Sequence, residues 1–394
     1  MTGDSRSVGI VGAGQLARMA CEAASALGLR TVVLAEHADD AATGVADEVV
    51  LGVPSRSKDL RLLADRCEVV TFDHELVDLD VLRTLIDEGV TVRPGVATLE
   101  MAIDKAEMRA RLSGAGIPVP AHLVLADPDP AAIGTFASEH GWPVVVKAAR
   151  GGYDGKGVWI AADAEQAAEI CQQASASQVS LLVEELVAIE AELAVLVARR
   201  PDGETRSWPV VETAQVDGVC REVLVPGRLT PDVAAAARDV AERVAEVAGS
   251  VGVLAVELFL SRHGLVVNEV AARPHNSGHW TIEGAVTSQF ENHLRAVLDL
   301  PLGSTAITAP EVASVNVFGS AEGADPGAAL ADALAIDGAH VHLYGKAPRP
   351  GRKLGHVTVC GEHADDVRAR AWTAARALGT PVPAGLIVPE GVAR

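Results

Sequence analysis

The first hundred residues alternate between strand and helix signals, and this alternation constrains the fold more than any other feature of the sequence. An apolar strand at 7–11 runs into a glycine turn at 12–14 and then into an alanine-rich helix that Gly28 ends. Later apolar runs predict further strands at 30–34, 69–72 and 90–94. Strands that alternate with helices form a parallel sheet with helices on both faces. We therefore predict an α/β fold for this part of the chain.

Two further units follow along the chain. A helix over about 102–113 is stopped by glycines and a proline, and the second unit begins there. This unit is predicted to contain strands at 143–147 and 180–184 and helices near 164–174 and 231–248. Beyond about residue 300, we expect strands at 314–318, 340–344 and 356–359, then a final helix over 364–378. At 394 residues the chain has room for two or three domains.

The stretch 253–269 predicts a β-hairpin, because two apolar runs flank a short turn around His263. If the turn centres on His263, Glu257 and Glu269 are each six residues from it and face each other. Cross-strand partners lie about 4.5–5.5 Å apart at Cβ, and like charges there repel. Such a pair is favourable when a hard cation lies between, and Mg²⁺ takes one or two carboxylates plus phosphate oxygens. A solvent-exposed acidic pair is the alternative.

A crowded polar run, 268–281, follows the hairpin. So many polar groups are costly to bury unless they bind something. His275 and His279 have the four-residue spacing of some zinc sites, but Pro274 and the Asn-Ser-Gly that follows prevent a regular helix across them. We therefore interpret His275 as a proton donor or hydrogen-bonding group for a substrate anion, and His279 as a residue that orients the loop.

The turn at 12–17, Gly-Ala-Gly-Gln-Leu-Ala, matches the G-x-G-x-x-A pattern of dinucleotide-binding proteins, and Glu36 follows about twenty residues later. This pattern is the outline of a dinucleotide-binding site, as a nicotinamide-dependent oxidoreductase would have. Alternatively, the glycines only make the tight turn and leave amide groups for any phosphate or carboxylate.

A second glycine-rich segment, 151–157, contains four glycines and Lys156, and it follows a strand that ends at Lys147. Glycines let backbone amides approach a polyphosphate closely, and lysine supplies charge. The spacing is not that of a Walker A motif. We expect a phosphate-covering lid, with a plain surface hairpin loop as the alternative.

Acidic and basic clusters mark two more candidate sites. Glu184 to Val187, with Glu190 and Glu192, place acidic groups beside an apolar wall, which suits an adenosine clamp or an exposed strand end. Four basic residues fall within eight positions of a predicted loop, namely Lys346, Arg349, Arg352 and Lys353. Against a net charge of −20, this cluster favours phosphate recognition over a merely solvated loop.

Composition excludes several classes of function. The net charge of −20 argues against binding to nucleic acids or to anionic membranes. No apolar run is long enough to span a bilayer, and the short polar N-terminus predicts no signal peptide. Five scattered cysteines are typical of reduced thiols, so we expect a cytoplasmic protein.

Together these motifs resemble the ATP-grasp superfamily and, within it, the N5-carboxyaminoimidazole ribonucleotide synthetase family. The resemblance runs from the glycine turn at 12–16 to 355–356. The 151–157 loop is partly shared with relatives that act on other purine intermediates, whereas the runs 273–281, 288–290 and 351–356 are more specific. The resemblance implies a mixed α/β and α+β architecture with a Rossmann-like domain over 1–102, an ATP-grasp domain over 103–300 with a lid at about 120–180, and a small β-rich domain over 301–394.

The resemblance also implies a role for each matching position. Catalytic roles would fall to Asp154, Lys156, Arg273 and His275, and Mg²⁺, or Mn²⁺ in its place, would bind Glu257 and Glu269. ATP as co-substrate would contact Lys105, Lys147, Gly151, Gly152, Tyr153, Asp154, Gly155, Lys156, Gly157, Glu184, Glu185, Leu186, Val187, Glu192, Gln215, Asn268 and Glu269. The ribonucleotide and bicarbonate would contact Tyr153, Asp154, Lys156, Arg273, His275, Asn276, Ser277, Lys346, Arg352 and Lys353. Lys105 stands where the family has arginine, and Gln215 where it often has histidine.

The implied reaction joins ATP, bicarbonate and 5-aminoimidazole ribonucleotide in purine biosynthesis, and the family is commonly homodimeric. Another ATP-grasp ligase or carboxylase is one alternative, although the chain has no biotin-acceptor segment. A nicotinamide-dependent oxidoreductase is the other, and it leaves the carboxylate pair and the 151–157 loop unexplained.

Overall fold

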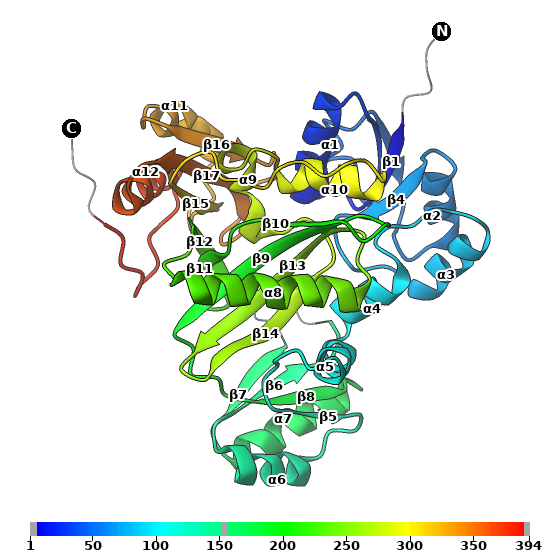
Figure 1. Cartoon of the computed structure of the whole chain (residues 1–394), viewed down its shortest axis with the longest axis vertical. Helices are drawn as coiled ribbons and strands as arrows, with labels where there is room; N and C mark the ends of the chain where they lie inside the picture. The colour runs from blue at the N-terminus through cyan, green and yellow to red at the C-terminus, as the bar shows by residue number, and fades with distance from the viewer. Residues whose placement is uncertain (1–5, 152–156, 390–394) are drawn as a thin grey trace.

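The computed structural model describes residues 6–151 and 157–389. The N-terminal domain holds a parallel sheet in the order β3-β2-β1-β4, with helices around it (Figure 1), which confirms the predicted α/β arrangement. Its strands are β1 Ser7–Val11, β2 Arg30–Ala35, β3 Glu48–Leu51 and β4 Val69–Phe72. Its helices are α1 Gln15–Ala26, α2 Ser57–Ala64, α3 Leu79–Asp87 and α4 Val96–Ile103.

Two local expectations for this region were wrong. The strand expected at 90–94 is reduced to a single parallel bridge between Val92 and Val70, because Pro94 has no N–H with which to continue the ladder. The single helix expected over 102–113 is divided into α4 and α5 Lys105–Gly114. Asp104 between them is extended, and its carboxylate accepts from the first amides of α5, so it caps a new helix rather than continuing the old one.

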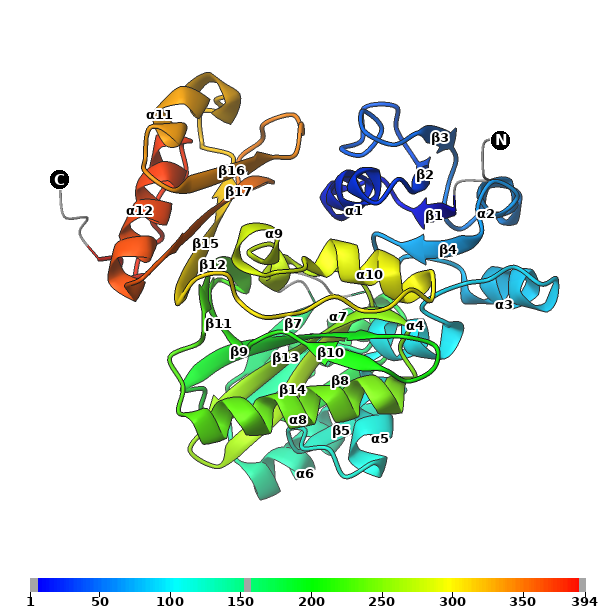
Figure 2. The same cartoon turned by 45° about the horizontal axis from the view of Figure 1, so that its top comes forward.

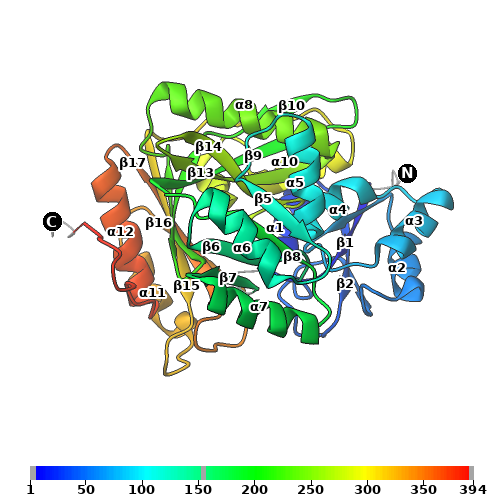
Figure 3. The same cartoon turned by 90° about the horizontal axis from the view of Figure 1, so that it is seen from below.

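An antiparallel sheet in the order β5-β8-β6-β7, here called the lid sheet, lies at the bottom of the view in Figure 1 and faces the viewer in Figure 3. Its strands are β5 His122–Leu125, β6 Val144–Ala148, β7 Val158–Ala161 and β8 Leu181–Glu185. Helices α6 Pro130–His140 and α7 Ala164–Ala176 pack on one face, where alternate strand residues such as Val144, Val146 and Val183 form the core. The other face is buried at Lys147, Leu182 and Glu184 and exposed at Val124, Val158 and Ile160.

Among the described residues, the central sheet has nine strands in the order β14-β13-β9-β11-β12-β15-β17-β16, with β10 beside β9. Helix α8 Pro231–Ala248 packs on one face, and α10 Gln289–Val297 packs on the other. Alanines and valines at helical spacing bury the inner side of α8, and Gly249 ends it in the left-handed conformation. The strands are β9 Ala191–Arg199, β10 Thr205–Ser207, β11 Val211–Val216, β12 Val219–Val225, β13 Gly252–Ser261 and β14 Gly264–Ala271.

The C-terminal strands join this same sheet. They are β15 Glu311–Phe318, β16 Ala339–Leu343 and β17 Lys353–Gly361, and β15 pairs with β12. Helix α12 Ala364–Ala377 packs on β15 and β17, with the short α11 Leu330–Leu334 beside it (Figure 2). Three domains are present, but the second and third share one continuous sheet. The exact domain boundaries stay predictions.

None of the described helices is both long and apolar enough to cross a membrane. Helix α10 lies between the central sheet and α1, and so joins the N-terminal domain to the centre of the molecule (Figure 2). The short turns η1 Asn276–Gly278, η2 Pro326–Ala329 and α9 Thr281–Gly284 complete the helices. The predicted absence of a regular helix across His275 and His279 is confirmed.

Candidate active site

The carboxylate pair lies on the hairpin of β13 and β14, which turns through residues 262–263. Continued without interruption, the register at this turn would place Glu257 opposite Asn268. Instead a bulge makes Asn268 the extra residue and pairs Glu257 with Glu269. The predicted facing of the two carboxylates is confirmed, but a bulge produces it rather than a turn centred on one residue.

The two carboxylates have the chemistry of a divalent-cation site. Burial, the facing Glu269 and the nearby Glu192 raise the pKa of Glu257 to about 7. Lys105 contacts the carboxylate of Glu269 through Nζ. A hard cation relieves the repulsion within such a pair, so the residues present fit Mg²⁺. Among the described residues no three His, Cys, Asp or Glu side chains gather into a metal-binding group, so phosphate and water would supply the other ligands.

Lys147 on β6 reaches from the lid sheet to the hairpin. Its Nζ lies 2.6 Å from Glu184 Oε2 and donates to Asn268 Oδ1 at 3.1 Å. Glu184 is buried, and its other oxygen accepts from Arg109 Nε at 2.5 Å. Burial would raise the pKa of Glu184, but Arg109 and Lys147 outweigh burial and hold that pKa below its ordinary value. Because this carboxylate is fully engaged, the adenosine contacts predicted for 184–187 would fall to backbone groups and neighbouring side chains.

The face of the lid sheet that carries Lys147 also carries apolar side chains. Val158 pairs directly with Lys147 across β7 and β6, and Val124, Val158 and Ile160 remain exposed. An apolar face beside a cationic side chain suits a planar base that carries phosphates. No sequence motif had indicated these residues. The available signal was the run 158–161, which has apolar residues on both faces, as strands covered on both sides do.

Glu192 and Gln215 lie on neighbouring strands of the central sheet. Glu192 on β9 is opposite Phe259 of β13 and Thr213 of β11, and burial raises its pKa. Gln215 on β11 is opposite Cys220, next to a register shift. Both residues therefore lie on the sheet that carries the carboxylate pair, and their contact with a nucleotide stays a prediction.

Arg273 is held by the N-terminal domain. Its Nε donates to Glu75 Oε2 at 2.9 Å, and Glu75 Oε1 accepts from the backbone N–H of Ala272 at 3.2 Å. Burial would lower the pKa of Arg273, but Glu75 raises it, so the guanidinium stays charged. No sequence motif had indicated a role for Glu75. Its position shortly after β4, at the carboxyl edge of a parallel sheet, is where ligand-binding residues of such sheets occur.

His275 links the polar run to the carboxylate pair. Its Nε2 lies 3.6 Å from Glu257 Oε1, and its Nδ1 lies 2.9 Å from Ser277 Oγ. Gln289 fixes the backbone, because its side chain accepts from His275 N–H at 2.8 Å and donates to His275 O at 2.7 Å. Burial, followed by Arg273, lowers the pKa of His275 to about 3, so the ring is neutral near pH 7. The side-chain nitrogen of Asn276 is buried with no hydrogen-bond partner among the described residues.

The basic loop meets the glycine turn of the N-terminal domain. Lys346 Nζ donates to the side chain of Gln15 and lies 5.9 Å from the centre of the Tyr344 ring. Arg352 donates to the backbone oxygen of Ala347 at 3.0 Å, and Lys353 begins β17. Burial lowers the pKa of Lys346. These side chains and the polar run are separated in sequence, and the fold brings the basic loop to the start of α1.

The glycine turn already has an anion bound to it, supplied by the chain itself. The carboxylate of Asp73 accepts from the backbone N–H groups of Gly14 and of Ala17, the latter at 3.1 Å. Gly12 has φ +97°, and a Cβ added there would lie 2.8 Å from the ring of His74. The amides that would hold a dinucleotide pyrophosphate are thus occupied, which argues against the oxidoreductase alternative.

Five residues of the predicted lid loop lie outside the described residues: Gly152, Tyr153, Asp154, Gly155 and Lys156. Their roles stay predictions. The flanking Gly151 and Gly157 both have positive φ, +81° and +72°.

Comparison with known protein families matches three segments of the chain. A ribonucleotide synthetase preATP-grasp domain matches residues 5–103, an ATP-grasp domain matches 110–290, and a phosphoribosylaminoimidazole carboxylase C-terminal domain matches 313–370. The N5-carboxyaminoimidazole ribonucleotide synthase of Mycobacterium tuberculosis (strain ATCC 25618 / H37Rv) is 47% identical over 378 residues, which cover 94% of this chain and 87% of the relative. This chain belongs to the N5-carboxyaminoimidazole ribonucleotide synthase family.

Solved structures of N5-carboxyaminoimidazole ribonucleotide synthases have the same fold. The Thermus thermophilus enzyme superposes with a TM-score of 0.86 at 34% identity, covering 95% of this chain and 99% of the other. The Aspergillus clavatus enzyme, solved with ADP and 5-aminoimidazole ribonucleotide, also gives 0.86 at 32% identity, with the same coverage. The chain is therefore an ATP-dependent ligase with an ATP-grasp domain.

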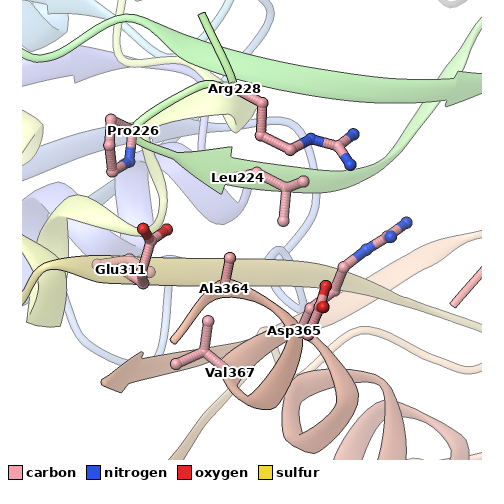
Figure 4. Close-up of a pocket in the computed structure, with 9 residues that line it drawn as sticks. Leu224, Pro226, Arg228, Glu311, Ala364, Asp365 and Val367 are labelled. Carbon is pink, nitrogen blue, oxygen red and sulfur yellow. The ribbon is translucent and has the colours of Figure 1, made fainter. Parts of the chain in front are cut away.

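A pocket away from the carboxylate pair lies between β12, β15 and the start of α12 (Figure 4). None of the predicted site residues lines it. Its cationic side chains are already paired, since Arg228 binds Glu212 and Arg368 binds Glu222. We assign no binding role to this pocket.

Proposed function

We propose that the chain converts ATP, bicarbonate and 5-aminoimidazole ribonucleotide into N5-carboxyaminoimidazole ribonucleotide, ADP and phosphate in purine biosynthesis. The names of its relatives and the ligands of similar solved structures support the ribonucleotide and the nucleotide. One geometric observation carries the proposal. The polar run 268–281 begins within β14, and Arg273 lies four residues after Glu269. Groups suited to a second anionic substrate therefore begin where groups suited to ATP phosphates end.

The first half-reaction is phosphoryl transfer. A bicarbonate oxygen attacks the γ-phosphorus of ATP, ADP leaves, and carboxyphosphate forms. This chemistry requires positioning and charge neutralisation more than covalent help. Lys147 on β6 and Arg273 after β14 would supply positive charge. Glu257 and Glu269 would hold Mg²⁺, or Mn²⁺ in its place, and that ion neutralises phosphate charge when bound.

The second half-reaction transfers the carboxyl group. The exocyclic amine of the ribonucleotide attacks the carboxyl carbon, phosphate leaves, and the nitrogen loses a proton. His275 is neutral near pH 7 because burial lowers its pKa to about 3, so it acts through hydrogen bonds rather than as a cation. Asn276, Ser277, Lys346, Arg352 and Lys353 would bind the ribonucleotide, as the resemblance implies. Tyr153, Asp154 and Lys156 would also contact the ribonucleotide and bicarbonate, as the resemblance implies.

The experiment is phosphate release from ATP, with the ribonucleotide and bicarbonate each added or omitted. We expect release only with both substrates, and formation of the carboxylated ribonucleotide in equal amount. Release that is indifferent to the ribonucleotide would indicate another ATP-grasp ligase and overturn the proposal.

Two accompanying properties are also proposals. We propose a homodimer, because members of the family commonly dimerise, and sedimentation equilibrium tests it. We propose a cytoplasmic location, because the five cysteines of the chain are scattered without disulfide spacing, and fractionation of cells that express the chain tests it.

A further inference from the structure

Arg109 is a fully buried arginine that no part of the proposed reaction uses. It lies on α5, a helix beside the lid sheet (Figure 1), and it is 0% exposed. Burying a guanidinium is costly unless its donors are satisfied. Here they are: Nε donates to Glu184 Oε1 at 2.5 Å, Nη2 donates to Asn268 O at 2.8 Å, and Nη1 lies 3.9 Å from Met108 Sδ.

These contacts close a ring of four residues between two sheets. Arg109 binds Glu184 on β8, Glu184 binds Lys147 on β6, Lys147 donates to the Asn268 side chain on β14, and the Asn268 backbone returns to Arg109. Two of the members come from the lid sheet and one from the central sheet. The ring therefore fixes the position of Lys147 relative to the hairpin.

The ring also reaches the carboxylate pair. The extra residue of a bulge is left without a regular ladder partner, and here Arg109 supplies a donor to the carbonyl of that residue, Asn268. The bulge is what places Glu257 opposite Glu269. The guanidinium of Arg109 thus contacts Glu184, which binds Lys147, and also Asn268, the bulge residue that places the two carboxylates face to face.

We propose that Arg109 is a positioning residue for the nucleotide site, which holds Lys147 through Glu184 and holds the carboxylate pair through the bulge at Asn268. The inference rests on the proposed function for its effect on turnover. Its effect on Mg-ADP binding needs neither bicarbonate nor the ribonucleotide, so the two proposals can fail separately.

The test compares Arg109→Met with Arg111→Met by calorimetric titration with Mg-ADP. Arg111 is the matched control, because it lies on the same helix but pairs with Glu107 and with the Ala97 carbonyl, away from the ring. We expect Arg109→Met to weaken Mg-ADP binding by about 10- to 100-fold, as loss of the residues that orient ligands does, and Arg111→Met to bind like the wild type. Binding by Arg109→Met within twofold of the control would overturn the proposal.

A double-mutant cycle separates positioning from general destabilisation. In a Lys147→Met background, Arg109→Met should cost clearly less binding than in the wild type, because part of its effect passes through Lys147. An equal loss in both backgrounds would show that Arg109 does not act through Lys147 and would contradict the proposal.

Arg109→Lys keeps the charge and carries the test if Arg109→Met does not fold. A single ammonium cannot reproduce the forked contacts of a guanidinium, so we expect weaker Mg-ADP binding at an unchanged circular dichroism spectrum. Wild-type affinity in that variant would overturn the proposal.

Discussion

Two buried glutamates, Glu184 in the candidate active site and Glu222 on β12 in the middle of the central sheet, show how the same residue type serves two purposes. Both side chains are almost completely buried, with 2% and 0% exposure. Glu222 on β12 receives two hydrogen bonds from Arg368, at 2.7 and 2.8 Å, and one from Trp372 Nε1 at 3.0 Å. Glu184 instead divides its two oxygens between Arg109 and Lys147.

The two clusters differ in the elements that they connect. Arg368 and Trp372 both lie on α12, so the Glu222 cluster is a closed contact between one strand and one helix. The Glu184 cluster extends through Lys147 to Asn268 on another sheet, next to the carboxylate pair. The Glu222 cluster stabilises the fold. The Glu184 cluster instead holds Lys147 beside the carboxylate pair, where its ammonium group can bind a phosphate.

The largest effect on turnover is expected at Glu269, in the carboxylate pair. Glu269→Gln should lower Mg-ATP turnover by about 10³-fold or more, because charge neutralisation at the phosphates is lost. The melting temperature should hardly change, since Glu269 is partly exposed. Turnover and thermal unfolding are measured on the same preparation. A near-normal rate would remove Glu269 from the metal site.

The next largest effect is a loss of stability, expected when the Glu222 cluster loses Arg368. Arg368→Met leaves Glu222 buried without its cation and should cost about 3 kcal/mol of unfolding free energy, measured by urea titration. The KM and kcat of the folded variant should stay within twofold of wild type. A large loss of turnover at unchanged stability would end the distinction between the two clusters.

A smaller effect is expected in the pH dependence of the melting temperature, which tests the Glu184 cluster. The pKa of Glu184 is held below its ordinary value in the folded chain, so its charge stabilises the fold above about pH 4.3 and this contribution is lost as the pH falls below that value. Glu184→Gln should therefore flatten the fall of melting temperature with acid. Glu169→Gln, at an exposed position on α7, is the control and should keep the wild-type slope.

The smallest effect should come from replacing the closed pair as a whole. Glu222→Leu combined with Arg368→Met leaves no unpaired charge, and such exchanges are often neutral or stabilising. We expect urea unfolding to show most of the stability lost in Arg368→Met restored. If the double variant is as unstable as the single one, the pair itself contributes the stability.

The sequence was sufficient for features that depend on neighbours along the chain. Gly28 follows the end of the first helix in the left-handed conformation, and the polar run interrupts regular structure, because both follow from local backbone and side-chain chemistry. The motifs also indicated the family, because the residues of the glycine-rich loop and of the polar run are each contiguous in the sequence.

Only the tertiary structure decided which distant groups meet. Counting along the hairpin cannot reveal the bulge at Asn268, nor can the glycine turn show that Asp73, 59 residues from Gly14, occupies its amides. Arg109 looks like an ordinary helix arginine, yet its partners lie 75 and 159 residues away. Such contacts depend on shape and charge complementarity between separate segments, which no local periodicity encodes.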